Sequence, residues 1–128
     1  MPDVEKITIN LPAVELGKID LLVQEGVYSN RTDCIRAGIR SQLERHGMEI
    51  QQSVHRHAFV VGAYYVNRET LVRMRTKGRK LTLAVVGLLS IAKDVEPELA
   101  EKVIASVKVR GVFTAADEVK AVLRERMS

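Results

Sequence analysis

The sequence predicts an α+β protein: a strand and two helices, followed by a small β-α-β-α-β-α domain. Three observations lead to this prediction. Residues 6–12, KITINLP, alternate polar and apolar side chains, as a half-buried strand does. Two helical patterns with one apolar side each follow directly. The rest of the chain alternates β-branched runs with capped helical stretches, so we expect domains at residues 1–47 and 54–128.

The predicted strand at residues 6–12 has two different faces. The face suited to a core consists of Ile7, Ile9 and Leu11. The other face carries donors and acceptors suited to base edges and consists of Lys6, Thr8 and Asn10. A lone strand leaves its backbone unpaired and buries too little surface, and no second strand follows nearby. The simplest partner is therefore the same strand of a second copy.

The two helices after this strand have recognisable ends. Pro12 sets φ for the first turn of a helix that runs to about Glu25. Asn30 is expected to cap the second helix, with Asp33 three residues later, and that helix should end near Gly47. The apolar side of the first helix comprises Leu16, Ile19, Leu22 and Val23. The apolar side of the second comprises Ile35, Ile39 and Leu43.

Together these elements resemble the ribbon-helix-helix DNA-binding proteins of the MetJ/Arc type, and in particular the CopG branch of plasmid copy-number repressors. The resemblance covers about the first third of the chain. It rests on the strand at residues 6–12, the turn EGVYSNRT at residues 25–32 and the helical run IRAGIR at residues 35–40. It implies an intertwined homodimer whose two strands form an antiparallel ribbon in the major groove.

The resemblance also implies two kinds of contact with double-stranded DNA. Base contacts would come from Lys6, Thr8 and Asn10. Phosphate contacts would come from Asn30, Arg31 and Thr32. The chemistry of these residues agrees, because Asn suits adenine, Lys suits guanine, and Thr suits a polar edge or a thymine methyl. The first N–H groups of the second helix and its dipole form an anion site, to which Arg31 adds a full charge.

Charge is unevenly distributed along the chain, which has a formal net charge of +4. Residues 1–50 hold six basic and eight acidic residues, residues 51–80 hold seven and one, and the remaining residues hold seven of each. The N-terminal domain is therefore acidic overall, and its binding face must be positive by local arrangement. The basic stretch includes Arg73, Arg75 and Lys77. They form either a solvated helix face, the usual case, or a secondary DNA surface.

The C-terminal domain is expected to contain three strand-helix units. Strands are expected at residues 58–66, 81–92 and 107–113. Helices are expected to start after Asn67, at Pro97, and after a capping box of Thr114 and Asp117. Gly87 and Gly111 lie inside strands and suggest a weak internal repeat, with Gly87 at a bulge or bend. Residues 48–53 are expected to be a linker or a fraying extension of the preceding helix.

Two roles fit this C-terminal domain. The simpler role is oligomerisation, which strengthens DNA binding by joining DNA-binding dimers into a higher oligomer. The other role is sensing of a small ligand, since nickel-responsive repressors join the same head to a C-terminal α+β domain. Their metal sites use several His and a Cys, whereas here only His55 and His57 share one side of a predicted strand. We therefore expect no cofactor, and these two His are the only metal-ligand candidates.

The sequence as a whole predicts a cytoplasmic, sequence-specific transcriptional regulator, a repressor, with no enzymatic activity and no membrane partner. It contains no phosphate loop, nucleophile elbow, signal peptide or long apolar run. The single cysteine, Cys34, fits a reducing compartment and is expected to be a small core residue. The alternative is an antitoxin-like or plasmid-maintenance protein whose C-terminal domain binds a protein partner. A disordered, charged tail would favour the antitoxin.

Overall fold

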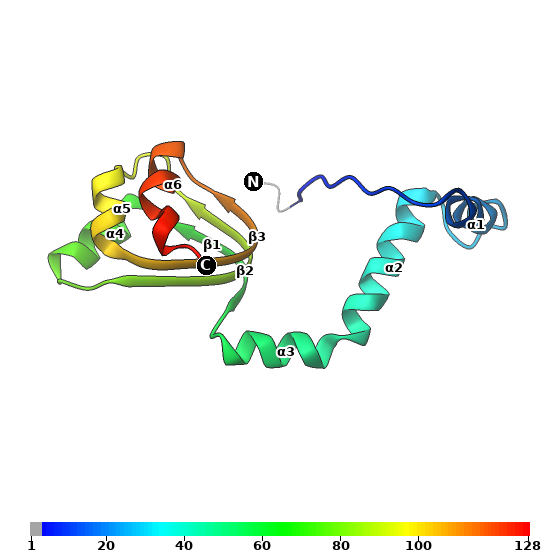
Figure 1. The fold of residues 1–128 in the computed structure, drawn as a ribbon, viewed down its shortest axis with the longest axis horizontal. Helices are drawn as coiled ribbons and strands as arrows, with labels where there is room; N and C mark the ends of the chain where they lie inside the picture. The colour runs from blue at the N-terminus through cyan, green and yellow to red at the C-terminus, as the bar shows by residue number, and fades with distance from the viewer. Residues whose placement is uncertain (1–3) are drawn as a thin grey trace. The chain divides into compact units, whose positions relative to one another are not determined.

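The computed structural model describes residues 4–128 and divides the chain into two compact units (Figure 1). The N-terminal unit is Lys6–Gln52, and the C-terminal unit is Ser53–Ser128 together with residues 4 and 5. The N-terminal unit contains α1, Ala13–Gln24, and α2, Arg31–Arg45. A third helix, α3, spans Gly47–Arg56, and therefore begins in this unit and ends in the next. Residues 48–53 are thus helical. The expected linker is wrong, and in place of the expected extension of the second helix there is a separate helix, because α2 ends at Arg45.

The start of α2 follows the capping prediction. The Asn30 side-chain oxygen accepts a hydrogen bond from the backbone N–H of Asp33 at 2.8 Å, and Asn30 itself has extended backbone. Pro12 precedes α1 with φ of −59°, which is suited to entering a helix. Gly26 closes the other end of α1 with φ of +79°. A left-handed conformation of this kind favours glycine because it has no Cβ.

Residues 4–12 form neither helix nor strand. A strand is defined by hydrogen bonds to a neighbour, and a single chain offers this segment none. The predicted strand is therefore not formed in the single chain.

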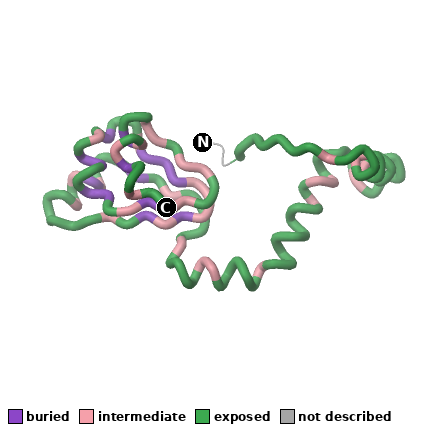
Figure 2. Tube along the Cα trace, viewed as in Figure 1, coloured by how far each residue is buried: buried purple, intermediate pink, exposed green. Residues whose placement is uncertain are grey.

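None of the described residues of the N-terminal unit is buried, as the absence of purple between residues 6 and 52 in Figure 2 shows. Cys34 and Ile35 are only half-buried. Ile39 and Leu43, which were expected on the apolar side of α2, are 46% and 56% exposed. Two helices are too small to enclose a core of their own. The apolar side predicted for this unit is consequently present but uncovered.

The C-terminal unit has the predicted β-α-β-α-β-α order. Its strands are β1, Val60–Val66, β2, Leu81–Ile91, and β3, Ile104–Thr114. Its helices are α4, Arg68–Thr76, α5, Pro97–Val103, α6, Asp117–Leu123, and the short 3-10 helix η1, Arg124–Arg126. The strands form a parallel sheet in the order β1-β2-β3. Crossover connections between parallel strands are right-handed, and here both crossovers step in the same direction across the sheet. They therefore place their helices on the same face of the sheet.

The core of this unit lies between the sheet and its helices. From β2, every second residue faces the helices, and Leu83, Val85 and Leu89 are at most 2% exposed. The helices contribute the buried residues Leu71, Leu99, Val103, Val119 and Leu123. The third strand was expected to start at residue 107, but β3 begins at Ile104, which is fully buried. The unit thus has a core of its own.

A row of three glycines crosses the sheet. Gly62 of β1 pairs in register with Gly87 of β2, which pairs with Gly111 of β3, and all three have φ between +130° and +134°. A Cβ at Gly87 would lie 2.2 Å from the Gly62 carbonyl oxygen. Gly87 and Gly111, which suggested the repeat, are therefore neighbours in the sheet, and Gly62 occupies the equivalent position in β1. The expected bulge at Gly87 is wrong, because the only register shift between β2 and β3 lies at Leu81/Thr82.

The two predicted helix caps of this unit differ in outcome. The Asn67 side chain accepts a hydrogen bond from the Thr70 N–H at 2.8 Å, which confirms the first. The predicted capping box of Thr114 and Asp117 is wrong. Thr114 ends β3, and the residue before α6 is Ala116, which has no side-chain cap. The strand simply continues further than its sequence pattern indicated.

Candidate nucleic-acid interface

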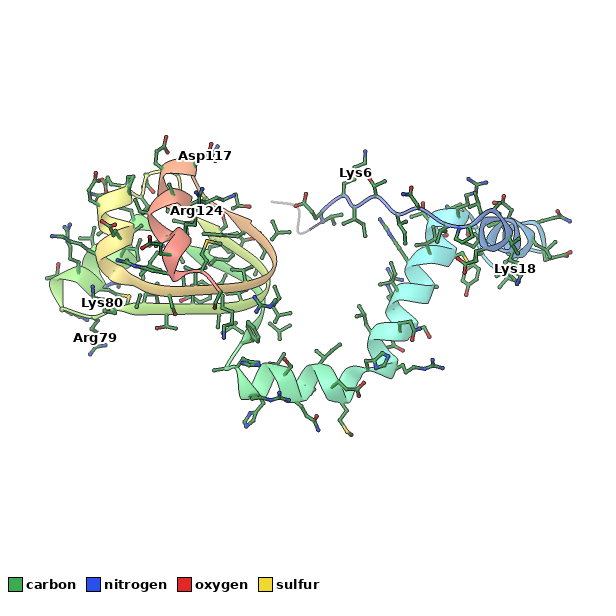
Figure 3. All side chains as sticks on the ribbon, viewed as in Figure 1. Lys6, Lys18, Arg79, Lys80, Asp117 and Arg124 are labelled. Carbon is green, nitrogen blue, oxygen red and sulfur yellow. The ribbon has the colours of Figure 1, made fainter. Side chains whose placement is uncertain are left out.

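The segment before α1 presents the three residues predicted to contact bases. Lys6, Thr8 and Asn10 are all exposed, and Figure 3 shows the Lys6 side chain projecting from this segment. Of the alternating apolar residues, Ile7 and Ile9 are exposed as well, at 74% and 59%, and Leu11 is half-buried. Exposed isoleucines at every second position are unfavourable in water and mark a surface for a partner. The segment therefore has both a polar face free for contacts and an apolar face that lacks a cover.

The start of α2 carries the predicted phosphate-binding residues. Asn30 and Thr32 are exposed, and the first-turn N–H groups have no partner within a helix. Asn30 satisfies the N–H of Asp33. The remaining first-turn N–H groups, of Arg31 and Thr32, then give this end of the helix its positive potential. These groups can bind one phosphate oxygen without any side-chain charge.

Arg31 is held by an ion pair that the sequence pattern did not indicate. Its Nε donates to Asp20 Oδ1 at 2.7 Å and its Nη2 donates to Asp20 Oδ2 at 2.9 Å, which joins α2 to α1. This two-pronged hydrogen bond lowers the pKa of the Asp20 carboxyl and raises the pKa of the Arg31 guanidinium. Asp20 therefore neutralises much of the charge that Arg31 would offer a phosphate. An acidic residue on the preceding helix was the only signal in the sequence.

A basic cluster lies at the end of α4 and in the loop that follows it. Arg73 and Arg75 occupy the last turn of the helix, Lys77 follows it, and all three are exposed. Arg79 projects from the same loop (Figure 3). The Lys80 Nζ, by contrast, donates to the carbonyl of Lys102. Two of these four cations thus lie in the last turn of α4 and two just beyond it, where the helix dipole favours positive charge.

The two histidines considered as metal ligands do not share a strand. His55 lies in the last turn of α3, and His57 follows this helix and packs edge-on against Phe59, with ring centroids 5.9 Å apart. The expectation that they share one side of a strand is wrong, because α3 continues through this part of the chain. Within residues 4–128, no group of three or more His, Cys, Asp or Glu side chains is arranged to hold a metal.

The family model of the ribbon-helix-helix transcriptional regulator family matches residues 2–120, nearly the whole chain. The chain belongs to this family. Membership makes it a DNA-binding transcriptional regulator, and the family assignment extends across both units. Because the match includes the parallel sheet, this sheet is part of the family pattern and not an unrelated fusion.

One relative is similar over a shorter stretch. The transcriptional regulator CdrS of Halobacterium salinarum is 26% identical over 42 residues, which are 33% of this chain and 76% of CdrS. No solved structure matches the chain. In the described part of the chain, no helix is long and apolar enough to cross a membrane.

Proposed function

We propose that this regulator binds operator DNA as a homodimer. Residues 6–12 of two copies pair as an antiparallel ribbon, and the ribbon enters the major groove. Lys6, Thr8 and Asn10 then face base edges, while Ile7 and Ile9 close a core shared by the two copies. The proposal rests on one observation above all. Polar and apolar side chains alternate along this segment, yet Ile7 and Ile9 are exposed in the single chain along with the polar set.

The rest of the N-terminal unit supports a shared core. Val14, Leu21, Val27 and Leu43 are each more than half exposed, and no described residue of this unit is buried. An apolar surface of this extent is unusual on a monomeric protein and typical of an obligate interface. Pairing two copies through the ribbon and helices would cover it. The homodimer is therefore the state in which this unit can fold stably.

Phosphate binding at the start of α2 would fix the ribbon in register on the DNA. We assign this role to the backbone N–H groups of Arg31 and Thr32, with Asn30 as the cap that positions them. Arg31 would add its charge only when Asp20 releases it. The protein then acts as a repressor by occupying operator DNA and blocking initiation of transcription.

The alternative, an antitoxin-like or plasmid-maintenance protein that binds a protein partner, gains less support. The C-terminal unit has its own buried core, including Leu71, Leu89 and Leu123. An antitoxin of this kind would instead carry a charged tail that folds on its partner. A folded parallel sheet fits a unit that assembles copies or binds a ligand.

Substitution of Asn10 tests the proposed base contact. Asn10→Ala should leave the dimer folded, because this side chain is exposed, and should weaken specific binding by about 1–3 kcal/mol. The operator is first obtained by binding selection on random DNA, and affinities are then measured on it and on an unrelated duplex. Gln51→Ala, an exposed amide in α3, is the matched control. Unchanged operator affinity of Asn10→Ala would contradict base reading by the ribbon.

A further inference from the structure

The two edges of the parallel sheet are treated differently by the fold. At the β3 edge, the Ser128 N–H donates to the Val107 carbonyl at 3.0 Å, and Met127 forms a parallel bridge with Val107. Arg110 also donates to the Ser128 carbonyl at 3.1 Å. At the other edge, residues 4–128 provide no strand beside β1 except β2. One edge is therefore covered and the other is open.

The open edge lacks the sequence features that normally protect an edge strand. Val60–Val66 reads VVGAYYV, without a charge or a proline, whereas β3 carries Lys108 and Arg110. Its side chains are well exposed, with Val60 at 51%, Val61 at 66% and Tyr65 at 54%. Free edges of this composition pair with other strands unless they are covered. The β1 edge is therefore suited to pairing with another strand.

The hydrogen bonds between β1 and β2 show which backbone N–H and C=O groups of β1 remain free on its outer side. The Ala92 N–H donates to the Val66 carbonyl at 2.9 Å, so the backbone polar groups of Val66 point toward β2. The polar groups of successive residues in a strand point to opposite sides. The outward-facing N–H and C=O groups of β1 consequently belong to Val61, Ala63 and Tyr65. They are centred on Ala63, the smallest of the three.

We propose that β1 pairs antiparallel with β1 of a second copy about a two-fold axis at Ala63, which joins two sheets into one six-stranded sheet. A two-fold contact between identical edges must be antiparallel, and it uses the same residues on both sides. In this register Ala63 lies opposite Ala63 of the partner subunit. Val61 lies opposite Tyr65 of the partner subunit, a β-branched and aromatic pair of the kind that stabilises sheets. Each of these pairs exchanges two backbone hydrogen bonds.

The uncharged composition of β1 favours a second copy as the occupant. A foreign strand would be selected by charges or by a shaped pocket, and Val60–Val66 offers no charge to select with. Gly62 is also consistent with a neighbour. Gly62 has φ of +130°, the same conformation that at Gly87 and Gly111 lets the preceding strand approach closely. No described atom lies within 4 Å of the position that a Cβ on Gly62 would occupy. Copies held together elsewhere would pair more readily through a raised local concentration.

Cysteine cross-linking of the full chain tests both the pairing and its register. All variants carry Cys34→Ser to remove the free thiol. Ala63→Cys should form a covalent dimer on mild oxidation at least about tenfold faster than Ala105→Cys, an exposed control in β3, because opposite residues are about 5.5 Å apart between Cα atoms. Val61→Cys alone should react slowly, since its two copies would be about 14 Å apart. A mixture of Val61→Cys and Tyr65→Cys chains should cross-link rapidly.

A charge introduced on the exposed edge of β1 gives a second, independent test of the pairing. Tyr65→Lys in the Ala63→Cys background should remove the rapid cross-linking, because two lysines would flank the paired strands. Tyr65 is more than half exposed, so the core is preserved and circular dichroism should be unchanged. Equal rates for Ala63→Cys and Ala105→Cys, or rapid cross-linking that survives Tyr65→Lys, would overturn the proposal. The result is independent of DNA reading, because none of these residues lies in the ribbon.

Discussion

Arg31 at the start of α2 donates two hydrogen bonds to Asp20 of α1, at 2.7 and 2.9 Å, in the bidentate geometry that joins a guanidinium to a carboxylate. The same guanidinium lies at the helix N-terminus that we assign to phosphate. Asp20 and a DNA phosphate therefore compete for one cation. Both side chains are about half exposed, so exchange between the two partners is open to solvent.

Removal of Asp20 should release Arg31 to the DNA. In Asp20→Ala, the slope of the logarithm of affinity against the logarithm of salt concentration should become steeper by up to about one unit, because one more phosphate is neutralised. Glu15→Ala, which removes an equal charge from the first turn of α1, is the control for general electrostatics. Equal slopes for the two variants, measured by fluorescence anisotropy on operator DNA, would show that Arg31 does not reach phosphate.

The same ion pair should make the N-terminal unit sensitive to acid. Arg31 lowers the pKa of Asp20 in the folded state, so the unfolded chain binds this proton more readily. The stabilisation is present above the unfolded pKa of about 4 and is lost as pH falls through the lowered folded pKa. The free energy of unfolding from urea titrations between about pH 7 and pH 3 should therefore fall more in the wild type than in Asp20→Asn. Parallel curves would contradict a stabilising pair.

A charge on the apolar face of the ribbon should break the shared core. Ile9→Asp buries a carboxylate wherever two copies meet, at a cost of several kcal/mol, on the order of the whole stability of a small unit. In the Tyr65→Lys background, where the sheet edge cannot pair, it should yield monomers in sedimentation experiments. Thr8→Asp places the same charge on the neighbouring polar face and should remain dimeric while losing DNA affinity. Similar behaviour of both variants would argue against a two-faced ribbon.

The basic cluster at the end of α4 allows two outcomes that salt dependence separates. If Arg73, Arg75 and Lys77 only form a solvated face, changing them to Gln leaves the salt slope of DNA binding unaltered. If they form a secondary DNA surface, the slope becomes shallower by about one unit for each phosphate that is no longer neutralised. We expect no change, because a solvated face is the usual role of such a stretch. The matched control is Lys93→Gln, an exposed cation outside the cluster.

Two members of the glycine row, Gly87 and Gly111, have no room for a side chain. Gly87→Ala places a Cβ 2.2 Å from the Gly62 carbonyl oxygen, so the strands must separate, and we expect a loss of more than about 3 kcal/mol in stability. Gly78→Ala is the control, because φ of +67° strains the backbone there while nothing lies within 4 Å. It should cost about 1–2 kcal/mol. Similar denaturation midpoints for the two variants would mean that the strands are not closely packed at Gly87.

Local features of this protein follow from the sequence because their causes are local. Asn30 and Asn67 cap helices through a backbone N–H three residues away, so the cap can be recognised without knowledge of the fold. The order of strands and helices in the C-terminal unit follows from apolar periodicity in the same way. The capping box predicted at Thr114 and Asp117 is wrong because Thr114 pairs with Ser90 of β2 and so ends β3, and no local pattern reveals this pairing.

By itself, then, the sequence determined the two-faced segment at residues 6–12, the helix caps at Asn30 and Asn67, and the alternation of elements in the C-terminal unit, all of which depend on neighbours along the chain. Only the tertiary structure decided that Gly62, Gly87 and Gly111 share one row, since strand register depends on packing between distant segments. It also decided that Asp20 holds Arg31, and that one sheet edge is covered while the other is open. These relations join residues far apart in the chain, and hydrogen bonds and burial select them only once the chain has folded.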